Sequence, residues 1–104
     1  MKISIVTPVL QRPEYLDQTI RSVVTQQGDF EIEYIVQNGG SDSRVIAILT
    51  KWEKLIKTGQ FESQCSSLTF KWYDEKDSGM YDALNRGFAR TSGDILAWIN
   101  SDDL

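Results

Sequence analysis

Residues 31–58, EIEYIVQNGGSDSRVIAILTKWEKLIKT, contain the strand, turn and helix on which the fold prediction rests. Residues 31–37 are rich in β-branched and aromatic side chains, which predicts a strand. Residues 38–42 are turn-forming types and interrupt that pattern. Apolar side chains then recur three and four positions apart over residues 45–56, which predicts a helix that ends at about Thr58. The unit is therefore one strand followed by one helix.

The same alternation continues on both sides of this unit. Three further strands are predicted at residues 2–7, 67–73 and 94–100, and two further helices at residues 13–27 and 80–90. We expect Pro8 to end the first strand and Gly28 to end the first helix. The order β-α-β-α-β-α-β indicates an α/β, Rossmann-like domain with a mostly parallel sheet of about four strands and helices on both faces. The strongly apolar fourth strand is expected to be buried on both faces.

Composition and charge exclude several function classes. With 104 residues, 40% of them hydrophobic and 25% charged, the chain has the size and composition of one globular domain. A net charge of −4 disfavours binding to nucleic acid or to an anionic membrane surface. The absence of histidine excludes His-dependent catalysis, and the lone Cys65 excludes an internal disulfide. The apolar runs are too short for a membrane span, and the cysteine content is typical of a cytoplasmic protein.

Four polar loops are predicted to meet at one edge of the sheet. The carboxyl ends of parallel strands share an edge, and ligands bind there. The loops that converge on this edge are residues 7–12, 38–42, 74–79 and 100–103. The first loop, TPVLQRP, lacks the glycine patterns of dinucleotide-binding and nucleoside-triphosphatase folds. A diphosphate would then need a divalent cation held by carboxylates, for which Asp102 and Asp103 are the candidates; the alternative is a solvated turn.

Three separated motifs carry a resemblance to a known family. They are Thr7-Pro8 with Arg12 after the first strand, Gly39-Gly40-Ser41-Asp42 after the second, and DSGMYDALNRGFARTSGDILAWINSDD at positions 77–103. In this order the motifs resemble the N-terminal, nucleotide-sugar-binding portion of inverting family 2 glycosyltransferases, which have the GT-A fold. The resemblance covers nearly the whole chain except residues 50–66.

The resemblance implies a function and a set of site residues. It implies transfer of a hexose-like sugar from a nucleoside-diphosphate sugar, with UDP-sugars favoured, to a glycan or lipid-linked acceptor in polysaccharide biosynthesis. It also implies Mn²⁺ or Mg²⁺ as cofactor and a cytoplasmic location, either free or peripheral at the inner face of the membrane. The implied metal ligands are Asp103 and Asp102. The implied donor-binding residues are Thr7, Pro8, Arg12, Asn38, Gly39, Asp77, Gly79, Asp82, Asn85 and Asp102.

Three departures from the family pattern matter for function. The turn Gly39-Gly40-Ser41-Asp42 lacks one residue of the family's usual Ser-Thr-Asp-Gly, and Ser43 stands in place of the glycine. Asn38 stands where the family usually has an aspartate that holds the edge of the base, so the choice of base is open. The sequence ends one residue after Asp103, and we expect residues 1–104 to be a truncated domain whose general base lies beyond residue 104. Such a chain is expected to be inactive alone. The alternatives are a non-catalytic nucleotide- or metal-binding module and an oligomerising module that forms a homodimer through the edge of the fourth strand.

Overall fold

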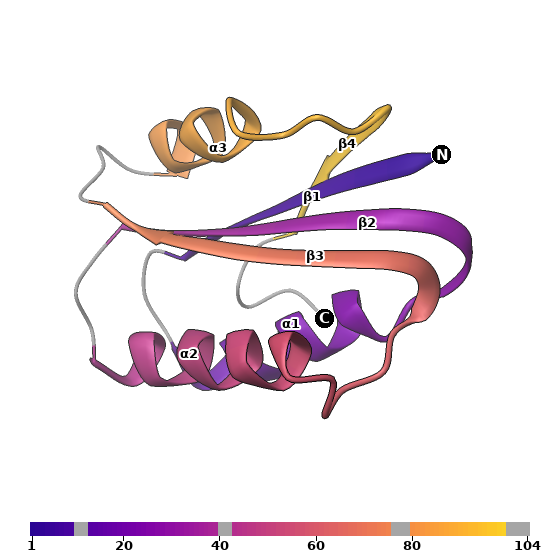
Figure 1. Cartoon of the computed structure of the whole chain (residues 1–104). Helices are drawn as coiled ribbons and strands as arrows, with labels where there is room; N and C mark the ends of the chain where they lie inside the picture. The colour runs from indigo at the N-terminus through magenta and orange to yellow at the C-terminus, as the bar shows by residue number, and fades with distance from the viewer. Residues whose placement is uncertain (10–12, 40–42, 76–79, 100–104) are drawn as a thin grey trace.

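The computed structural model describes residues 1–9, 13–39, 43–75 and 80–99. Strands and helices alternate along the chain as the sequence predicts (Figure 1). The elements are β1 (Lys2–Val9), the 3₁₀ helix η1 (Pro13–Tyr15), α1 (Leu16–Val24), β2 (Gln27–Asn38), α2 (Ser43–Lys57), β3 (Gln64–Asp74), α3 (Met80–Phe88) and β4 (Ile95–Trp98). Among the described helices, none is both long enough and apolar enough to cross a membrane.

The four described strands form one parallel sheet in the order β3-β2-β1-β4. Helices α1 and α2 cover one face of this sheet and α3 covers the other (Figure 1). The main core lies on the α1 and α2 side, and its largest buried side chains are Trp52, Tyr34, Leu16, Ile20, Ile32 and Leu49. A smaller core under α3 contains Val6, Ile35 and Leu84, with Tyr73 and Phe88 packed against them. The predicted parallel α/β architecture is therefore confirmed.

The expectation that Pro8 ends the first strand is wrong, because Pro8 lies within β1. The carbonyl of Val6 accepts a hydrogen bond from the N–H of Ile99, so even-numbered residues of β1 direct their backbone groups toward β4. Pro8 faces the same way, two residues beyond the last β1–β4 pair of Val6 with Trp98. At this position no described residue of β4 is paired with β1, so no hydrogen bond is lost because proline has no N–H. Strand β1 therefore tolerates Pro8.

The expectation that Gly28 ends the first helix is also wrong. Helix α1 ends at Val24, and Gly28 lies in β2 with a φ of +146°. The β2–β3 register shifts between Gly28 and Glu31, as in a β-bulge, and a Cβ at Gly28 would overlap the Phe30 ring. Glycine is therefore required at position 28 by an irregularity of the strand. The sequence pattern had instead suggested that this glycine ends a helix.

The fourth strand is shorter and far more exposed than predicted. Strand β4 pairs with β1 alone and lies at an edge of the described sheet. Ile95, Leu96 and Trp98 are 46%, 52% and 45% exposed. The expectation of burial on both faces was therefore wrong for the described residues. It rested on apolar composition, and composition does not indicate which elements pack against a strand.

A buried carboxylate anchors the loop that leads into β4. The Glu33 side chain on β2 accepts hydrogen bonds from the Ser4 hydroxyl and from the backbone N–H of Ser92, both at 2.8 Å. The Gly93 N–H in turn donates to the Ser4 hydroxyl oxygen at 2.8 Å. We call these four residues the Glu33 clasp. A Cβ at Gly93 would overlap the Ser4 oxygen, so the loop approaches β1 this closely only with glycine at that position.

Candidate functional site

The carboxyl ends of β1, β2 and β3 finish at the same level of the sheet. Val9 pairs with Asn38, and Asn38 pairs with Asp74. The first residue after β2 and the first residue after β3 are each hydrogen-bonded to the neighbouring strand. Gly39 N–H donates to the Val9 carbonyl (3.1 Å), and Glu75 N–H donates to the Asn38 carbonyl (2.9 Å). We call these five residues the carboxyl rim. The predicted convergence of three strand ends at one edge is therefore present.

Asn38 and Asp74 form a side-chain pair at this rim. The Asn38 side chain is buried, and its Nδ2 lies 3.1 Å from Asp74 Oδ1. An ionised carboxylate can only accept hydrogen bonds, so the nitrogen end of the amide must face Asp74. The Asp74 side chain itself is exposed. Sequence reasoning placed Asn38 in the site and Asp74 only in a loop, whereas the register of β2 and β3 brings the two together.

A second polar cluster lies beside the rim, on the α3 side of the sheet. Arg90 Nη1 contacts Glu75 Oε1 at 2.7 Å and Gln37 Oε1 at 2.6 Å, and its guanidinium lies 3.8 Å from the centroid of the Tyr73 ring. Gln37 Nε2 donates to the same Glu75 oxygen at 2.9 Å. The hydrogen bonds from Arg90 and then Gln37 lower the pKa of Glu75 to about 2. Glu75 is thus fixed to β2 just before the segment that contains Asp77.

Thr7 and Pro8 lie on β1 shortly before the rim, and both are buried. The Thr7 hydroxyl is 2.8 Å from the Tyr34 hydroxyl inside the main core. Burial raises the pKa of Tyr34, which keeps the phenol neutral and able to donate or accept in this pair. The Thr7 side chain therefore points into the protein interior on the α1 and α2 side. Contact of Thr7 and Pro8 with a donor nucleotide stays a prediction.

The two predicted site residues on α3 lie on the opposite side of the sheet from Thr7. Asp82 accepts a hydrogen bond from Arg86 Nε at 3.2 Å, one helical turn away, and Asn85 is exposed. The local pairing of Asp82 is what an i,i+4 spacing on a helix favours. The remaining predicted site residues lie outside the described part of the chain; they are Arg12, Asp77, Gly79, Asp102 and Asp103.

Within the described residues, no group of three or more metal-binding side chains gathers at one point. The rim nevertheless offers the type of ligand that Mg²⁺ and Mn²⁺ prefer, since Asp74 and Asn38 carry carboxylate and amide oxygens. The predicted ligands Asp102 and Asp103 follow β4 by a few residues. The donor chemistry of this edge of the sheet is thus compatible with a hard divalent cation.

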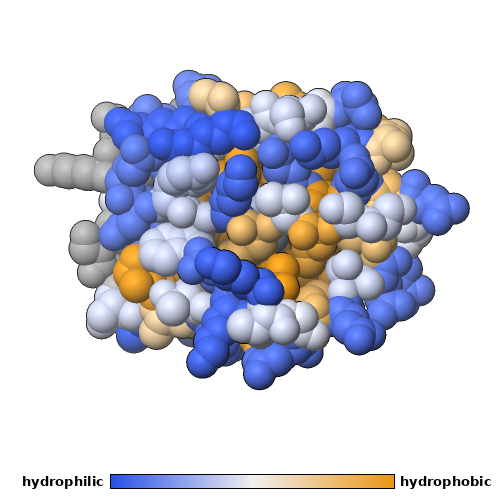
Figure 2. All heavy atoms as spheres, in the orientation of Figure 1, coloured by the Kyte–Doolittle hydropathy of each residue, from blue (hydrophilic) through white to orange (hydrophobic). Residues whose placement is uncertain are grey.

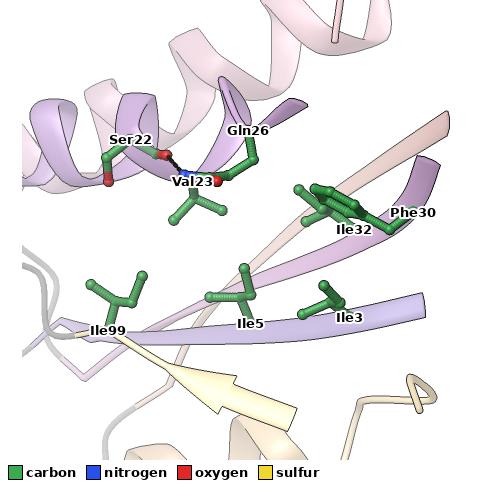
Figure 3. Close-up of a pocket in the computed structure, with 8 residues that line it drawn as sticks. All are labelled: Ile3, Ile5, Ser22, Val23, Gln26, Phe30, Ile32 and Ile99. Atoms are coloured by element: carbon green, nitrogen blue, oxygen red, sulfur yellow. Dashed lines mark hydrogen bonds between the residues drawn. The ribbon is translucent and has the colours of Figure 1, made fainter. Parts of the chain in front are cut away.

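An apolar cavity of about 350 Å³ lies between α1 and the sheet. Figure 3 shows Ile3, Ile5 and Ile99 on the sheet side and Val23 on α1 pointing into it. The complete lining is Ile3, Ile5, Ser22, Val23, Gln26, Phe30, Ile32 and Ile99. Without a charged residue in its wall, this cavity is unsuited to a diphosphate, and the rim remains the candidate site.

Comparison with known proteins identifies the class to which this fold and rim belong. Residues 4–104 match the model of Glycosyl transferase family 2, and the chain belongs to this family. It is similar to an uncharacterised glycosyltransferase of Mycobacterium tuberculosis, with 35% identity over 101 residues that cover 97% of this chain and 34% of the relative. An uncharacterised glycosyltransferase of Rickettsia bellii is 33% identical over 103 residues, which cover 99% of this chain and 13% of the relative.

A solved structure extends the comparison to the fold. The crystal structure of S. aureus TarS 1–349 superposes with a TM-score of 0.65 at 18% identity, and the match covers 98% of this chain and 28% of that chain. The expectation of a Rossmann-like GT-A portion is therefore confirmed, together with the family resemblance. The chain spans about a third of the length of its Mycobacterium tuberculosis relative and little more than a quarter of the TarS chain.

Proposed function

We propose that this chain supplies the donor-binding part of a sugar-transferring enzyme that uses a nucleoside-diphosphate sugar and inverts the anomeric centre. The observation that carries the proposal is the shared level of Val9, Asn38 and Asp74, since it brings three strand ends to the edge where α/β sheets bind ligands. Family membership supports sugar transfer as the reaction. A glycan or lipid-linked acceptor, polysaccharide biosynthesis and a cytoplasmic location, free or at the inner membrane face, belong to the same proposal.

In this proposal the chain's own residues bind and orient the donor. Asp102 and Asp103 hold Mn²⁺ or Mg²⁺, which when bound supplies positive charge for the leaving diphosphate. We expect contacts to the nucleotide from residues on or next to the ends of β1 and β2, namely Thr7, Pro8, Asn38 and Gly39, and from Arg12 in the segment of sequence that follows β1. The remaining donor contacts come from the β3–α3 segment and α3, namely Asp77, Gly79, Asp82 and Asn85.

Nucleotide binding tests this proposal directly. Isothermal titration of the full-length gene product with UDP, GDP and dTDP, each with and without Mn²⁺, should give binding that strengthens with the metal. Replacing Asp103 with Asn should abolish the metal-dependent part of the affinity while leaving the unfolding temperature unchanged. If none of the three nucleotides binds with or without Mn²⁺, the proposed function is wrong.

We also propose that residues 1–104 alone transfer no sugar. The support is that the match covers only 34% of the Mycobacterium tuberculosis relative, while acceptor binding and a general base are separate requirements of the reaction. An assay of the isolated chain with the donor that the full-length product uses should give no sugar transfer. Measurable sugar transfer by the isolated chain would overturn this expectation. If the full-length product binds the donor but transfers no sugar, the result would favour a non-catalytic nucleotide-binding module.

A second candidate role is self-association through β4. The strand lies at an edge of the described sheet with three exposed apolar side chains, and such an edge is a template for strand pairing. We propose that two copies of the chain pair along this edge. Sedimentation at tens of micromolar should reveal a dimer, and Leu96→Lys should shift it toward monomer. A wild-type chain that sediments as a clean monomer would contradict this role.

A further inference from the structure

One arginine attaches the turn after α3 to the ends of two strands. Arg90 Nη1 lies 2.7 Å from Glu75 Oε1 and donates to Gln37 Oε1 at 2.6 Å, and its guanidinium lies over the Tyr73 ring. Gln37 is the second-to-last residue of β2, and Glu75 directly follows β3. A single side chain therefore joins the end of α3 to the carboxyl ends of β2 and β3.

The buried amide of Gln37 makes these three side chains one unit. Gln37 is 0% exposed, so both polar atoms of its side chain need partners inside the protein. Its Nε2 donates to Glu75, and its Oε1 accepts from Arg90. Removing the arginine takes away this donor to a buried carbonyl oxygen, and a half-satisfied buried network is less favourable than a complete one.

The unit holds the same two strand ends that carry the Asn38–Asp74 pair. Gln37 precedes Asn38 on β2, and Glu75 follows Asp74, with its N–H donating to the Asn38 carbonyl at 2.9 Å. Successive side chains of a strand point to opposite faces of a sheet. The Arg90 unit therefore fixes the position of Asn38 from the face opposite to the one on which Asn38 meets Asp74.

The same arginine fixes the end of α3. Arg90 follows the last helical residue, Phe88, by two positions, and its backbone N–H donates to the Gly87 carbonyl at 3.0 Å. Helix α3 lies close to the sheet, because a Cβ at Gly87 would overlap the Val6 side chain. Two proposed donor contacts, Asp82 and Asn85, lie on this helix.

We propose that Arg90 is a positioning residue for donor binding, which acts through Glu75 and Gln37 and does not itself contact the donor. This inference rests on the proposed function and adds a residue outside the set expected to bind the nucleotide. Arg90 holds the ends of β2 and β3 and the helix α3 in one arrangement before the donor arrives, so less freedom is lost on binding. Its charge is already paired with Glu75, which favours this indirect role over a direct contact with the diphosphate.

Four substitutions and one control separate the possible roles. Arg90→Gln and Glu75→Gln each remove one partner, and the double variant removes both. Arg90→Lys keeps the charge and places several N–H donors on one nitrogen, as Nη1 requires. The control is Arg21→Gln, because Arg21 is an exposed arginine on α1 that also lies over an aromatic ring, that of Trp52 at 5.3 Å, on the other side of the sheet.

The experiment is a titration of the full-length gene product and its variants with UDP, GDP and dTDP in the presence of Mn²⁺, at a temperature where circular dichroism shows every protein folded. We expect Arg90→Gln and Glu75→Gln each to weaken the best-bound nucleotide by about two- to tenfold, as for one lost hydrogen bond. The double variant should be no weaker than either single variant, because the two residues act as a unit. Arg90→Lys should keep most of the affinity, and Arg21→Gln all of it.

The other outcomes overturn the inference and identify the reason. Wild-type affinity in Arg90→Gln, with only the unfolding temperature lowered, would make the arginine merely structural. Weaker binding in Arg90→Gln but not in Glu75→Gln would indicate a direct contact between the guanidinium and the nucleotide. Losses that multiply in the double variant would show that the two residues act independently. Each of these results leaves the proposed function standing, whereas no binding by the wild-type protein would remove both.

Discussion

The two edge strands of the described sheet are both apolar in composition, yet they are held in different ways. Strand β3 places Leu68, Phe70 and Trp72 against the main core, and its burial alternates along the strand. Strand β4 exposes Ile95, Leu96 and Trp98, and its leading loop is anchored by the Glu33 clasp. In Figure 2, apolar residues lie in the middle of the face over β2 and β3, surrounded by hydrophilic ones. One edge is thus held by packing along its length and the other by hydrogen bonds at its start.

This difference explains where the candidate site is well defined. The β2–β3 side of the rim is cross-linked on both faces of the sheet, by Asn38–Asp74 on one face and by the Gln37–Glu75–Arg90 cluster on the other. Proteins place binding groups on rigid elements because a fixed acceptor loses less freedom when the ligand binds.

The largest expected effect comes from truncating a packed residue on β3. Phe70 contacts the buried Tyr34 ring, with centroids 5.7 Å apart, and lies against the main core. Phe70→Ala should lower the free energy of unfolding by about 2–3 kcal/mol, toward the lower end for buried aromatic residues because Phe70 is only partly buried. Urea denaturation monitored by circular dichroism measures this change.

The matched substitution on the other edge is Leu96→Ala. Leu96 is 52% exposed, so its truncation should change the free energy of unfolding by less than about 0.5 kcal/mol in a monomeric sample. If Leu96→Ala costs as much as Phe70→Ala, then β4 is covered in solution and the comparison of the two edges fails. Measuring at low protein concentration separates this outcome from self-association.

The next largest effect concerns the Glu33 clasp. Glu33→Gln keeps a carbonyl oxygen at the Oε1 position that can accept from both Ser4 and Ser92. It removes the charge, however, and places an N–H₂ group at the Oε2 position, beside the Lys2 ammonium and the Ser92 hydroxyl. We expect a loss of about 2 kcal/mol in the free energy of unfolding, typical of a hydrogen bond to a charged group. Asp29→Asn, on the exposed early part of the same strand, is the control and should change stability by less than about 0.5 kcal/mol.

The same carboxylate predicts a dependence of stability on pH. Burial opposes ionisation of Glu33, but the hydrogen bonds from Ser92 and Ser4, with the charge of Lys2, outweigh burial and lower the pKa of Glu33. Because the folded-state pKa is below the unfolded value, ionised Glu33 stabilises the fold above the unfolded pKa of about 4.5, and this contribution is lost as pH falls through the lowered pKa. Stability should therefore fall on acidification from about pH 5.

Thermal unfolding of wild type and Glu33→Gln at several acidic pH values measures this contribution. The variant should lose less stability than the wild type over the same interval, because the glutamine cannot titrate. Glu75, whose pKa is lowered to about 2, acts in the same direction in both proteins and does not affect the difference between them. Parallel curves for the two proteins would show that Glu33 does not contribute to the pH dependence.

Most of the helices and strands could be predicted from the sequence because each has a characteristic local pattern of side chains. The apolar stripe of α2 and the β-branched run of β2 each indicate their element without knowledge of neighbours. Pro8 and Gly28 were misread because the first depends on which way a strand directs its N–H and the second on the register of a bulge. Both are properties of paired strands, which no single segment contains.

The candidate site, like the fold, could be predicted from the sequence only in part. Asn38 was predicted because it directly follows an apolar strand, whereas its pairing with Asp74 depends on the β2–β3 register. Gln37 and Arg90 were missed because they lie 53 residues apart, one on β2 and the other just after α3, and only the packing of these elements brings their side chains together. Sequence patterns locate the strand ends, but the geometry that joins side chains from different strands comes from the sheet.

Two tryptophans that both pack on the α1 and α2 side are expected to differ in their contribution to stability. Trp72 Nε1 is buried without a hydrogen-bond acceptor among the described residues, whereas Trp52 Nε1 donates to Asp17 Oδ1 at 2.8 Å. Trp72→Phe removes apolar contact but also an unpaired buried N–H, and these two effects oppose each other. The free energy of unfolding should change by less than about 1 kcal/mol, against a loss of about 2–3 kcal/mol for Trp52→Phe. Equal losses measured by urea denaturation would mean that the Trp72 indole N–H is paired in solution, and β3 would then depend on a hydrogen bond as well as on packing.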